Sequence, residues 1–128
     1  MAVPRLSRLE LQIMELLWTL GPSCVRDIVD AFPAKKPPVY TTIQTTIYRL
    51  ETKNAVRRAK KVGNVQVYEA AVARAAAHRR LVDDFLDLFG GRTQPVMTHL
   101  IESGRLSEED VKEAQKVYRQ LSKKGRSS

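Results

Sequence analysis

Four uncharged polar side chains recur at helical spacing near the middle of the chain. They are Thr41, Gln44, Thr45 and Tyr48. At about 100° per residue they share one face of a helix. Hydroxyl, amide and phenol groups there donate and accept hydrogen bonds without adding charge, which is the chemistry that reads base edges in a DNA groove. The alternative is a weak surface helix, rich in β-branched residues, that contacts no ligand.

The opposite face of the same segment is apolar. Ile43, Ile47 and Leu50 follow one another at i, i+4 and i+7, so this face is predicted to dock on a hydrophobic core. Asn54 stands where a residue in the left-handed conformation commonly ends a helix. The segment therefore predicts one helix with a buried side and a hydrogen-bonding side.

A basic β-hairpin is predicted directly after this helix. Residues 55–60 form its first strand, Gly63 and Asn64 its turn, and Val65–Tyr68 its return strand. Six basic residues against one acidic residue between positions 49 and 61 give a local net charge of +5. Cations beside a reading helix favour contact with DNA phosphates. An alternative is an edge strand that uses charge to discourage aggregation. The predicted phosphate contacts are Thr42, Thr46, Arg49, Arg57, Arg58, Lys60 and Lys61.

Capping residues and helix breakers define the elements that must hold these side chains. Ser7 and Glu10 have the spacing of a capping box, and the first helix is predicted to stop at Gly21. A second helix spans 25–32 and is ended by Pro33. The order helix, helix, polar helix, hairpin is that of a winged helix-turn-helix, predicted here for residues 1–71. The fold class is mainly α with a small β-hairpin.

Residues 72–128 are predicted to be a helical dimerisation domain. A helix over 72–89 carries two apolar rows, a short helix starts near Thr93, and Ser107 caps a last helix with apolar residues spaced 3, 4, 3. Such helices expose more apolar surface than so short a segment can hide, so a second copy should cover it. Alternatively, the rows fold back on the front domain. The predicted dimer contacts are Leu81, Phe85, Leu88, Val111, Ala114, Tyr118 and Leu121.

Composition bounds the class of protein. The 128 residues carry a net charge of +8 and a pI near 9.9, which favours a polyanionic partner. No apolar run approaches the roughly 20 residues of a membrane span, so no membrane insertion and a cytoplasmic location are expected. Cys24 is the single cysteine, and neither it nor His78 and His99 belongs to a catalytic or metal-binding motif. We expect no enzyme activity, no cofactor and no metal.

Four stretches in order and at matching spacing resemble one known family. They are LELQIMELLW at 9–18, VRDI at 25–28, YTTIQTTIYRL at 40–50, and FGG at 89–91 with LS at 106–107. The chain is similar, over about residues 6–122, to the penicillinase-repressor family of bacterial transcriptional repressors, the BlaI/MecI/CopY type. The resemblance implies a dimeric winged-helix repressor that binds a palindromic operator upstream of resistance or stress genes. It also implies relief of repression through a membrane metallopeptidase sensor or, in the copper-responsive branch, through metal.

The chain departs from that family at three places. Its end, KKGRSS, has no cysteine-rich tail, which argues against direct copper sensing. His99-Leu100 stands where the penicillinase repressors have an Asn-Phe cleavage bond, so this bond is the candidate site of proteolysis. Cys24 replaces the usual threonine cap of the second helix, and Asn54 replaces the usual glycine after the third.

The sequence thus predicts a dimeric DNA-binding repressor. Thr41, Gln44, Thr45 and Tyr48 would read bases of double-stranded operator DNA. The alternative from another class is a winged-helix module that binds a protein partner through the same surface and has little DNA binding. The local charge of +5 argues against that alternative.

Overall fold

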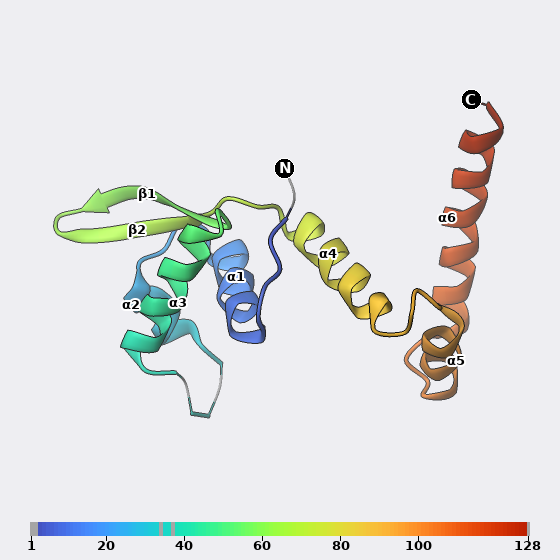
Figure 1. Ribbon diagram of the computed structural model, residues 1–128, viewed down its shortest axis with the longest axis horizontal. Coiled ribbons are helices and arrows are strands. Elements are labelled where there is room, and N and C mark those ends of the chain that lie inside the picture. The colour runs from blue at the N-terminus through green and yellow to red at the C-terminus, as the bar shows by residue number, and fades with distance from the viewer. Residues whose placement is uncertain (1–2, 34, 37, 128) are drawn as a thin grey trace. The chain divides into compact units, whose positions relative to one another are not determined.

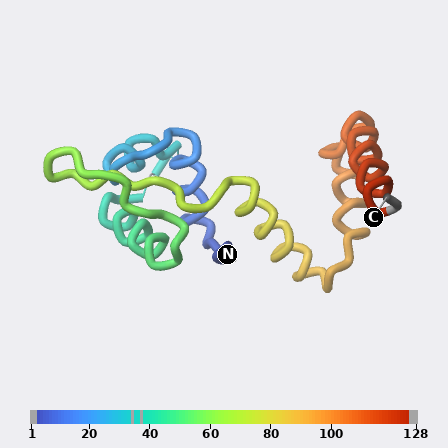
Figure 2. Tube along the Cα trace, turned by 90° about the horizontal axis from the view of Figure 1, so that it is seen from above, coloured from blue at the N-terminus to red at the C-terminus, as the bar shows by residue number. Residues whose placement is uncertain are grey.

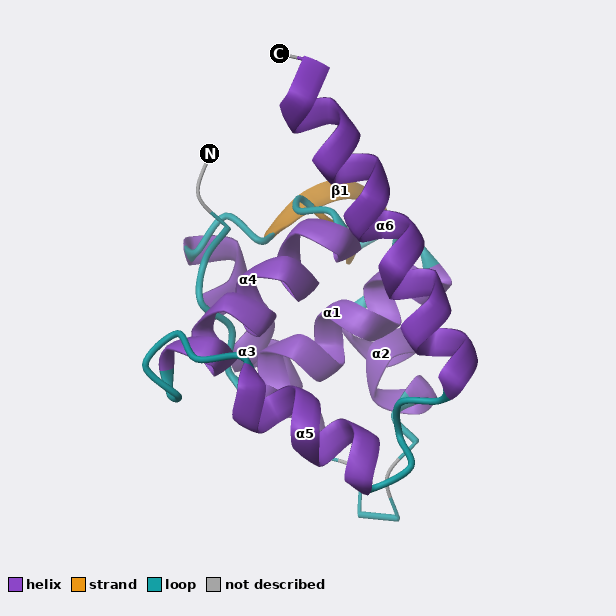
Figure 3. Ribbon diagram, turned by 90° about the vertical axis from the view of Figure 1, so that its right-hand side faces the viewer, coloured by secondary structure: helices purple, strands orange, loops and turns teal. Residues whose placement is uncertain are grey.

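The computed structural model describes residues 3–33, 35–36 and 38–127. Helices make up most of this part of the chain, and its strands are confined to one hairpin (Figure 3). The chain divides into two compact units, and the division falls after Asp84. Among the described residues, no helix is long and apolar enough to cross a membrane. The predicted fold class, a mainly helical winged helix-turn-helix with a β-hairpin, is confirmed.

The first unit begins with two helices that end as the sequence predicts. Helix α1, Arg8–Leu20, starts with the predicted capping box, in which Ser7 and Glu10 each accept a backbone N–H of the other. Helix α2, Val25–Ala31, is capped at Cys24 without a thiol hydrogen bond, and the carboxylate of Asp27 accepts the Cys24 N–H instead. Both helices contribute to one hydrophobic core.

Helix α3, Tyr40–Thr52, lies across α1 and α2 (Figure 1). The predicted docking residues Ile43, Ile47 and Leu50 are all completely buried in the core. Asn54 has a φ of 63°, so the predicted left-handed residue after the helix is confirmed. The helix therefore has one buried face, and its hydrogen-bonding face is turned outward.

The wing consists of β1, Val56–Val62, and β2, Val65–Ala70, paired antiparallel around a turn at Gly63. It extends beyond the helices of its unit in both views (Figure 1, Figure 2). Ser23, between α1 and α2, exchanges two backbone hydrogen bonds with Tyr68, which fixes the base of the wing to the helices. The register shifts between Arg58 and Lys60, so Ala59 is an extra residue on β1.

Helix α4, Arg74–Asp87, packs on α1 through its first turns. The indole N–H of Trp18 donates to the carbonyl of Val72, and the Trp18 ring contacts His78 edge-on at 5.8 Å. Glu15 of α1 pairs with both Arg74 and His78. These contacts place residues 72–84 with the winged helix, whereas the sequence put the domain boundary after residue 71. Assignment of dimerisation to residues 72–128 stays a prediction.

The second unit contains the end of α4, α5, Gln94–Glu102, and α6, Glu108–Ser127. Gly90 and Gly91 both have positive φ after α4, as expected at a helix end. Ser107 and Asp110 form a reciprocal cap at the start of α6. None of the described side chains from 85 to 125 is buried, so this unit has no closed core of its own within one chain.

Candidate nucleic-acid interface

The outer face of α3 displays most of the predicted base-reading residues. Thr41 and Thr45 are exposed, Tyr48 is 44% exposed, and Gln44 is half-buried. No charged side chain stands among these four positions. Because Ile43 and Ile47 are buried in the core, packing docks the helix with this face turned outward. Such a rigid, neutral, hydrogen-bonding surface matches the requirement for reading base edges.

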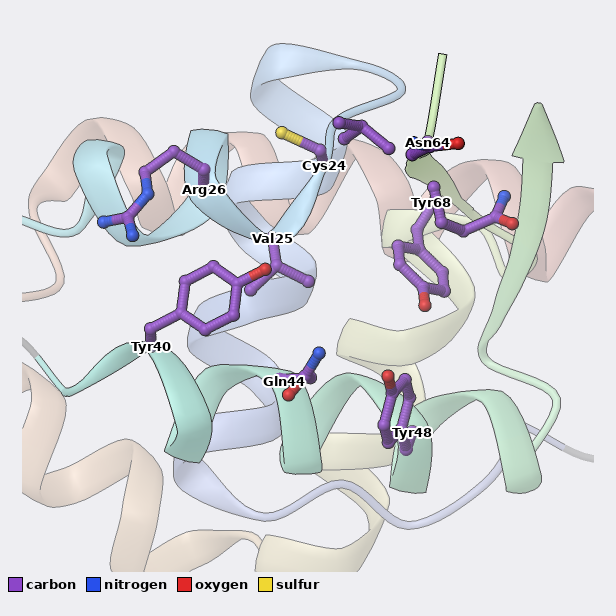
Figure 4. Close-up of a pocket in the computed structure, with 10 residues that line it drawn as sticks. Cys24, Val25, Arg26, Tyr40, Gln44, Tyr48, Asn64 and Tyr68 are labelled. Atoms are coloured by element: carbon purple, nitrogen blue, oxygen red, sulfur yellow. The ribbon is translucent and has the colours of Figure 1, made fainter. Parts of the chain in front are cut away.

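Two adjacent surface grooves divide these residues. Thr41 and Thr45, together with Thr42, Thr46 and Arg49, line a shallow groove of about 280 Å³ along α3. Gln44 and Tyr48 instead line a pocket of about 440 Å³ between α3, the start of α2 and the wing (Figure 4). The four residues share one face of α3, and the two grooves border that face on its two flanks.

Thr46 has a different environment from the other threonines. It is only 4% exposed, and its hydroxyl donates a 2.7 Å hydrogen bond to the carbonyl of Thr42, one turn earlier. The Thr46 hydroxyl is therefore poorly placed to donate a hydrogen bond to a DNA phosphate, because it is buried and its proton is already shared with the Thr42 carbonyl. The neighbouring Thr42 and Arg49 are both exposed.

The β-bulge sorts the cations of the wing onto two faces. Paired residues of antiparallel strands share a face, so Arg57 and Lys60, opposite Glu69 and Val67, lie on one side. By the same register, the other side carries Arg58 and Lys61, which lie opposite Tyr68 and Gln66. Strict alternation along the strand would instead have put Arg58 and Lys60 together. The bulge at Ala59 thus exchanges the two lysines, so that Lys60 shares a face with Arg57 and Lys61 shares a face with Arg58.

The two arginines of the wing already have acidic partners. Arg57 lies 3.3 Å from Glu69 across the hairpin, and Arg58 donates to Glu51 of α3 at 2.8 Å. The hydrogen bond that Arg58 donates to Glu51, together with the negative charge of Glu51, raises the pKa of Arg58. Within the described part of the chain, Lys60 and Lys61 have no ion pair and are exposed. The unpaired lysines are therefore the wing cations most available to a polyanion.

Lys53, which the sequence counts in the same basic cluster, is turned inward. Its ammonium donates to Glu10 Oε1 at 2.7 Å and to the carbonyl of Arg5 at 2.9 Å. Burial opposes ionisation of Glu10, but hydrogen bonds from Lys53 and Ser7 outweigh it and lower the pKa of the carboxyl. Lys53 therefore neutralises a buried carboxylate, and its charge is not directed to an outside ligand.

Sequence reasoning did not assign three residues of this surface, Arg26, Tyr40 and Cys24, to the site. The guanidinium of Arg26 lies over the ring of Tyr40, 4.9 Å from its centroid, at one end of the pocket in Figure 4. Cys24 lines the same pocket without a thiol cap bond. Arg26 and Tyr40 are fourteen positions apart in sequence, and no local pattern signals their contact.

No metal centre is formed by the described residues, since no three histidine, cysteine or carboxylate side chains gather there. His78 pairs with Glu15, and His99 is exposed on α5. Within the described residues, most of the side chains predicted to contact DNA gather on the surface of α3 and the wing.

Comparison with known proteins identifies the family of the chain. The sequence model described as penicillinase repressor matches residues 6–120. The chain belongs to the penicillinase repressor family. Members of this family are winged-helix transcriptional regulators that bind DNA, and the fold described above is a winged helix-turn-helix. The resemblance read from the sequence is confirmed over nearly the same range.

Individual proteins and solved structures are similar to this chain at moderate sequence identity. An uncharacterized 16.5 kDa protein of Latilactobacillus sakei is 28% identical over 109 residues, which cover 84% of this chain and 74% of that protein. Monomeric BlaI of Bacillus licheniformis, solved in complex with the blaP half-operator, is 26% identical with a TM-score of 0.49. That match covers 58% of this chain and 89% of the BlaI chain.

A second solved structure has a comparable match. The homodimeric winged helix-turn-helix DNA-binding domain Mb0332 of Mycobacterium bovis is 27% identical with a TM-score of 0.43. The match covers 61% of this chain and 67% of the Mb0332 fragment. Of these two solved structures, BlaI is described in complex with a half-operator and Mb0332 is described as a homodimer.

Proposed function

We propose that this chain is a dimeric repressor whose α3 reads a palindromic operator in the major groove of double-stranded DNA. The observation that carries the proposal is the rigid neutral face of α3 next to unpaired lysines of the wing. Thr41, Gln44 and Thr45 supply hydrogen bonds to base edges, and Tyr48 adds a phenol at the C-terminal end of the same face. A repressor of operator DNA acts in the cytoplasm, which is where we place the protein.

The wing and the flanks of α3 supply the phosphate contacts in this proposal. Thr42, Arg49, Lys60 and Lys61 are exposed, and none of them pairs with an acidic side chain among the described residues. Arg57 and Arg58 can contribute only by sharing their charge with Glu69 and Glu51. We leave Thr46 out of the set because its hydroxyl is buried and already donates to Thr42.

The dimer of the proposal is held by the second unit and the adjacent end of α4. Large apolar side chains remain at the surface there, for example Leu88 at 81% and Tyr118 at 75% exposure. Apolar surface of this extent on helices without a core favours a second copy. The proposed interface residues are Leu81, Phe85, Leu88, Val111, Ala114, Tyr118 and Leu121. Two copies related by a two-fold axis match the two halves of a palindrome.

Repression in this proposal ends when the dimer is disabled by cleavage in α5. The candidate bond is His99-Leu100, and a membrane metallopeptidase sensor is the candidate source of the cleaving activity. Loss of the dimer lowers operator occupancy because the second reading helix is no longer held nearby at high effective concentration. The reading face of α3 need not change.

The experiment that tests the function selects binding sites from random duplex DNA with the full-length protein. A two-fold symmetric consensus, bound in gel shifts at 50 mM and 200 mM salt more tightly than shuffled duplex, is the expected result. The matched variants are Gln44→Ala on α3 and the double variant Lys60→Ala, Lys61→Ala on the wing. Failure to enrich any sequence, with no salt-dependent binding to random duplex, would contradict the proposal and favour a protein partner.

A further inference from the structure

The pocket between α2, α3 and the wing contains one charged side chain, Arg26, among the residues that line it. The others are neutral hydrogen-bonding or apolar groups, and no carboxylate is among them. The lining residues are Cys24, Val25, Arg26, Tyr40, Gln44, Tyr48, Asn64, Val65, Gln66 and Tyr68. At about 440 Å³ the pocket is large enough for one nucleotide unit of a DNA backbone. Its chemistry suits an occupant with a single negative charge and several hydrogen-bond acceptors.

Arg26 is held at the edge of this pocket from two sides. Its guanidinium stacks on Tyr40 at 4.9 Å, and Asp30 lies one helical turn away at 4.0 Å. The Arg26 side chain is nevertheless 62% exposed, so its remaining N–H groups can donate to an outside ligand. The contact with the Tyr40 ring restricts where the guanidinium lies, which reduces the entropy lost when it binds an anion.

The pocket adjoins residues that the proposed function assigns to base reading. In Figure 4, Gln44 and Tyr48 rise from α3 between Arg26 and Tyr40 at one end and Asn64 and Tyr68 at the other. A DNA strand whose bases meet Gln44 has its backbone within one nucleotide of that contact. A phosphate adjoining bases bound at Gln44 would then lie close to this pocket, in which Arg26 is the one charged lining side chain.

We propose that this pocket holds one phosphodiester of the operator strand, with Arg26 as its charged partner and Tyr40 as the residue that positions Arg26. The inference rests on the proposed function and adds a site that the sequence analysis does not include. Lys61 lies on the same face of the wing as Tyr68 and Gln66, so the wing adds a second cation on the pocket side. The backbone of one strand is thus held between α2 and the wing, while α3 enters the groove.

The first test measures the salt dependence of binding to the selected consensus duplex. Arg26→Ala should weaken binding about ten- to hundredfold and reduce the slope of log K against log salt by about 0.9. Arg105→Ala, an exposed arginine in the turn before α6, removes the same charge elsewhere and should leave the slope unchanged. Tyr40→Phe keeps the stacking ring and should bind like the wild type, while Tyr40→Leu should lose part of the affinity.

The second test removes the charge from the DNA instead. Duplexes with a single neutral methylphosphonate at successive backbone positions are titrated with wild-type protein and with Arg26→Ala. One position should weaken the wild type strongly and the variant little, because the contact is already lost in the variant. Circular dichroism of each variant checks that the winged helix is folded.

Two results would overturn the inference while leaving the proposed function intact. One is an unchanged salt slope for Arg26→Ala when Lys60→Ala, Lys61→Ala lowers it. The other is that every methylphosphonate position weakens wild type and Arg26→Ala by the same factor. Absence of consensus binding by the wild type would instead contradict the proposed function itself.

Discussion

The ammonium group of Lys53 lies 2.7 Å from Glu10 Oε1 and joins the end of α3 to the first turn of α1. Glu10 is 3% exposed, and its second oxygen, Oε2, is buried without a hydrogen-bond partner among the described residues. A carboxylate in this position depends on Lys53 for its compensation, since little water reaches it. The pair therefore fixes where α3 ends relative to the core.

Replacing Lys53 with methionine should destabilise the fold by about 3 kcal/mol, because Glu10 would remain buried without its cation. The double variant Glu10→Leu, Lys53→Met should recover much of that loss, since it removes both charges. Urea unfolding followed by circular dichroism measures both. Lys112→Met, which removes an exposed 3.9 Å pair with Glu108, is the control and should change stability little. Equal losses for Lys53→Met and Lys112→Met would contradict the role of the buried pair.

Stability should depend on acid through the same carboxyl. The pKa of Glu10 is lowered from its ordinary value of 4.5, so the unfolded chain binds the proton more tightly than the folded one. The contribution of Glu10 is therefore fully present above about pH 4.5 and is lost as pH falls through the lower folded pKa. Urea midpoints from pH 3 to pH 6 should fall more steeply towards acid for the wild type than for Glu10→Gln. Parallel curves would show that Glu10 is not the group responsible.

Base reading and phosphate binding should separate in substitution experiments. Gln44→Ala or Thr45→Ala should cost about 1–3 kcal/mol on the consensus duplex and leave random duplex binding unchanged. Lys60→Ala or Lys61→Ala should weaken binding to both duplexes and reduce the salt slope by roughly 0.9 for each lost contact. Fluorescence anisotropy at several salt concentrations gives both quantities. The division of labour is wrong if all four variants lose the same factor on random duplex.

Dimerisation should fail when charge enters the apolar stripe of α6. Leu121 is 64% exposed in one chain, and burying a leucine at an interface contributes on the order of 1.5–3 kcal/mol. Leu121→Asp should therefore shift the protein towards monomer in light scattering at micromolar concentration. Gln120→Asp introduces the same charge on the side of α6 opposite Val111 and Tyr118, and it should stay dimeric. A wild-type protein that is monomeric at this concentration would refute the proposed assembly.

Proteolytic sensitivity should concentrate in and just after α5. This helix has nine residues, none of them buried, and it is followed by Ser103 and Gly104, so local unfolding should need less energy there than in α1 or α3. Limited digestion read by mass spectrometry should find the first cuts between Thr98 and Gly104, with loss of operator binding. Resistance of this segment, together with release from DNA on adding a metal or small molecule, would contradict the cleavage mechanism.

The sequence by itself determined the features that depend on near neighbours in the chain. Ser7 and Glu10 signal the start of α1 because a capping box closes within one turn. The spacing of Ile43, Ile47 and Leu50 fixes the buried face of α3, since helical period alone sets which side chains share a side. Asn54 marks the end of the helix because few other side chains accept a positive φ.

Only the tertiary structure decided which charges and hydroxyls are available. Lys53 belongs to the basic cluster in sequence, yet Glu10, forty-three positions away, holds it inward. The bulge at Ala59 exchanges the faces of the following lysines, and no residue pattern in β1 signals it. Arg26 meets Tyr40 only because α2 and α3 pack together. Such contacts join residues far apart in sequence, and their geometry follows from how the whole core packs, which no local period encodes.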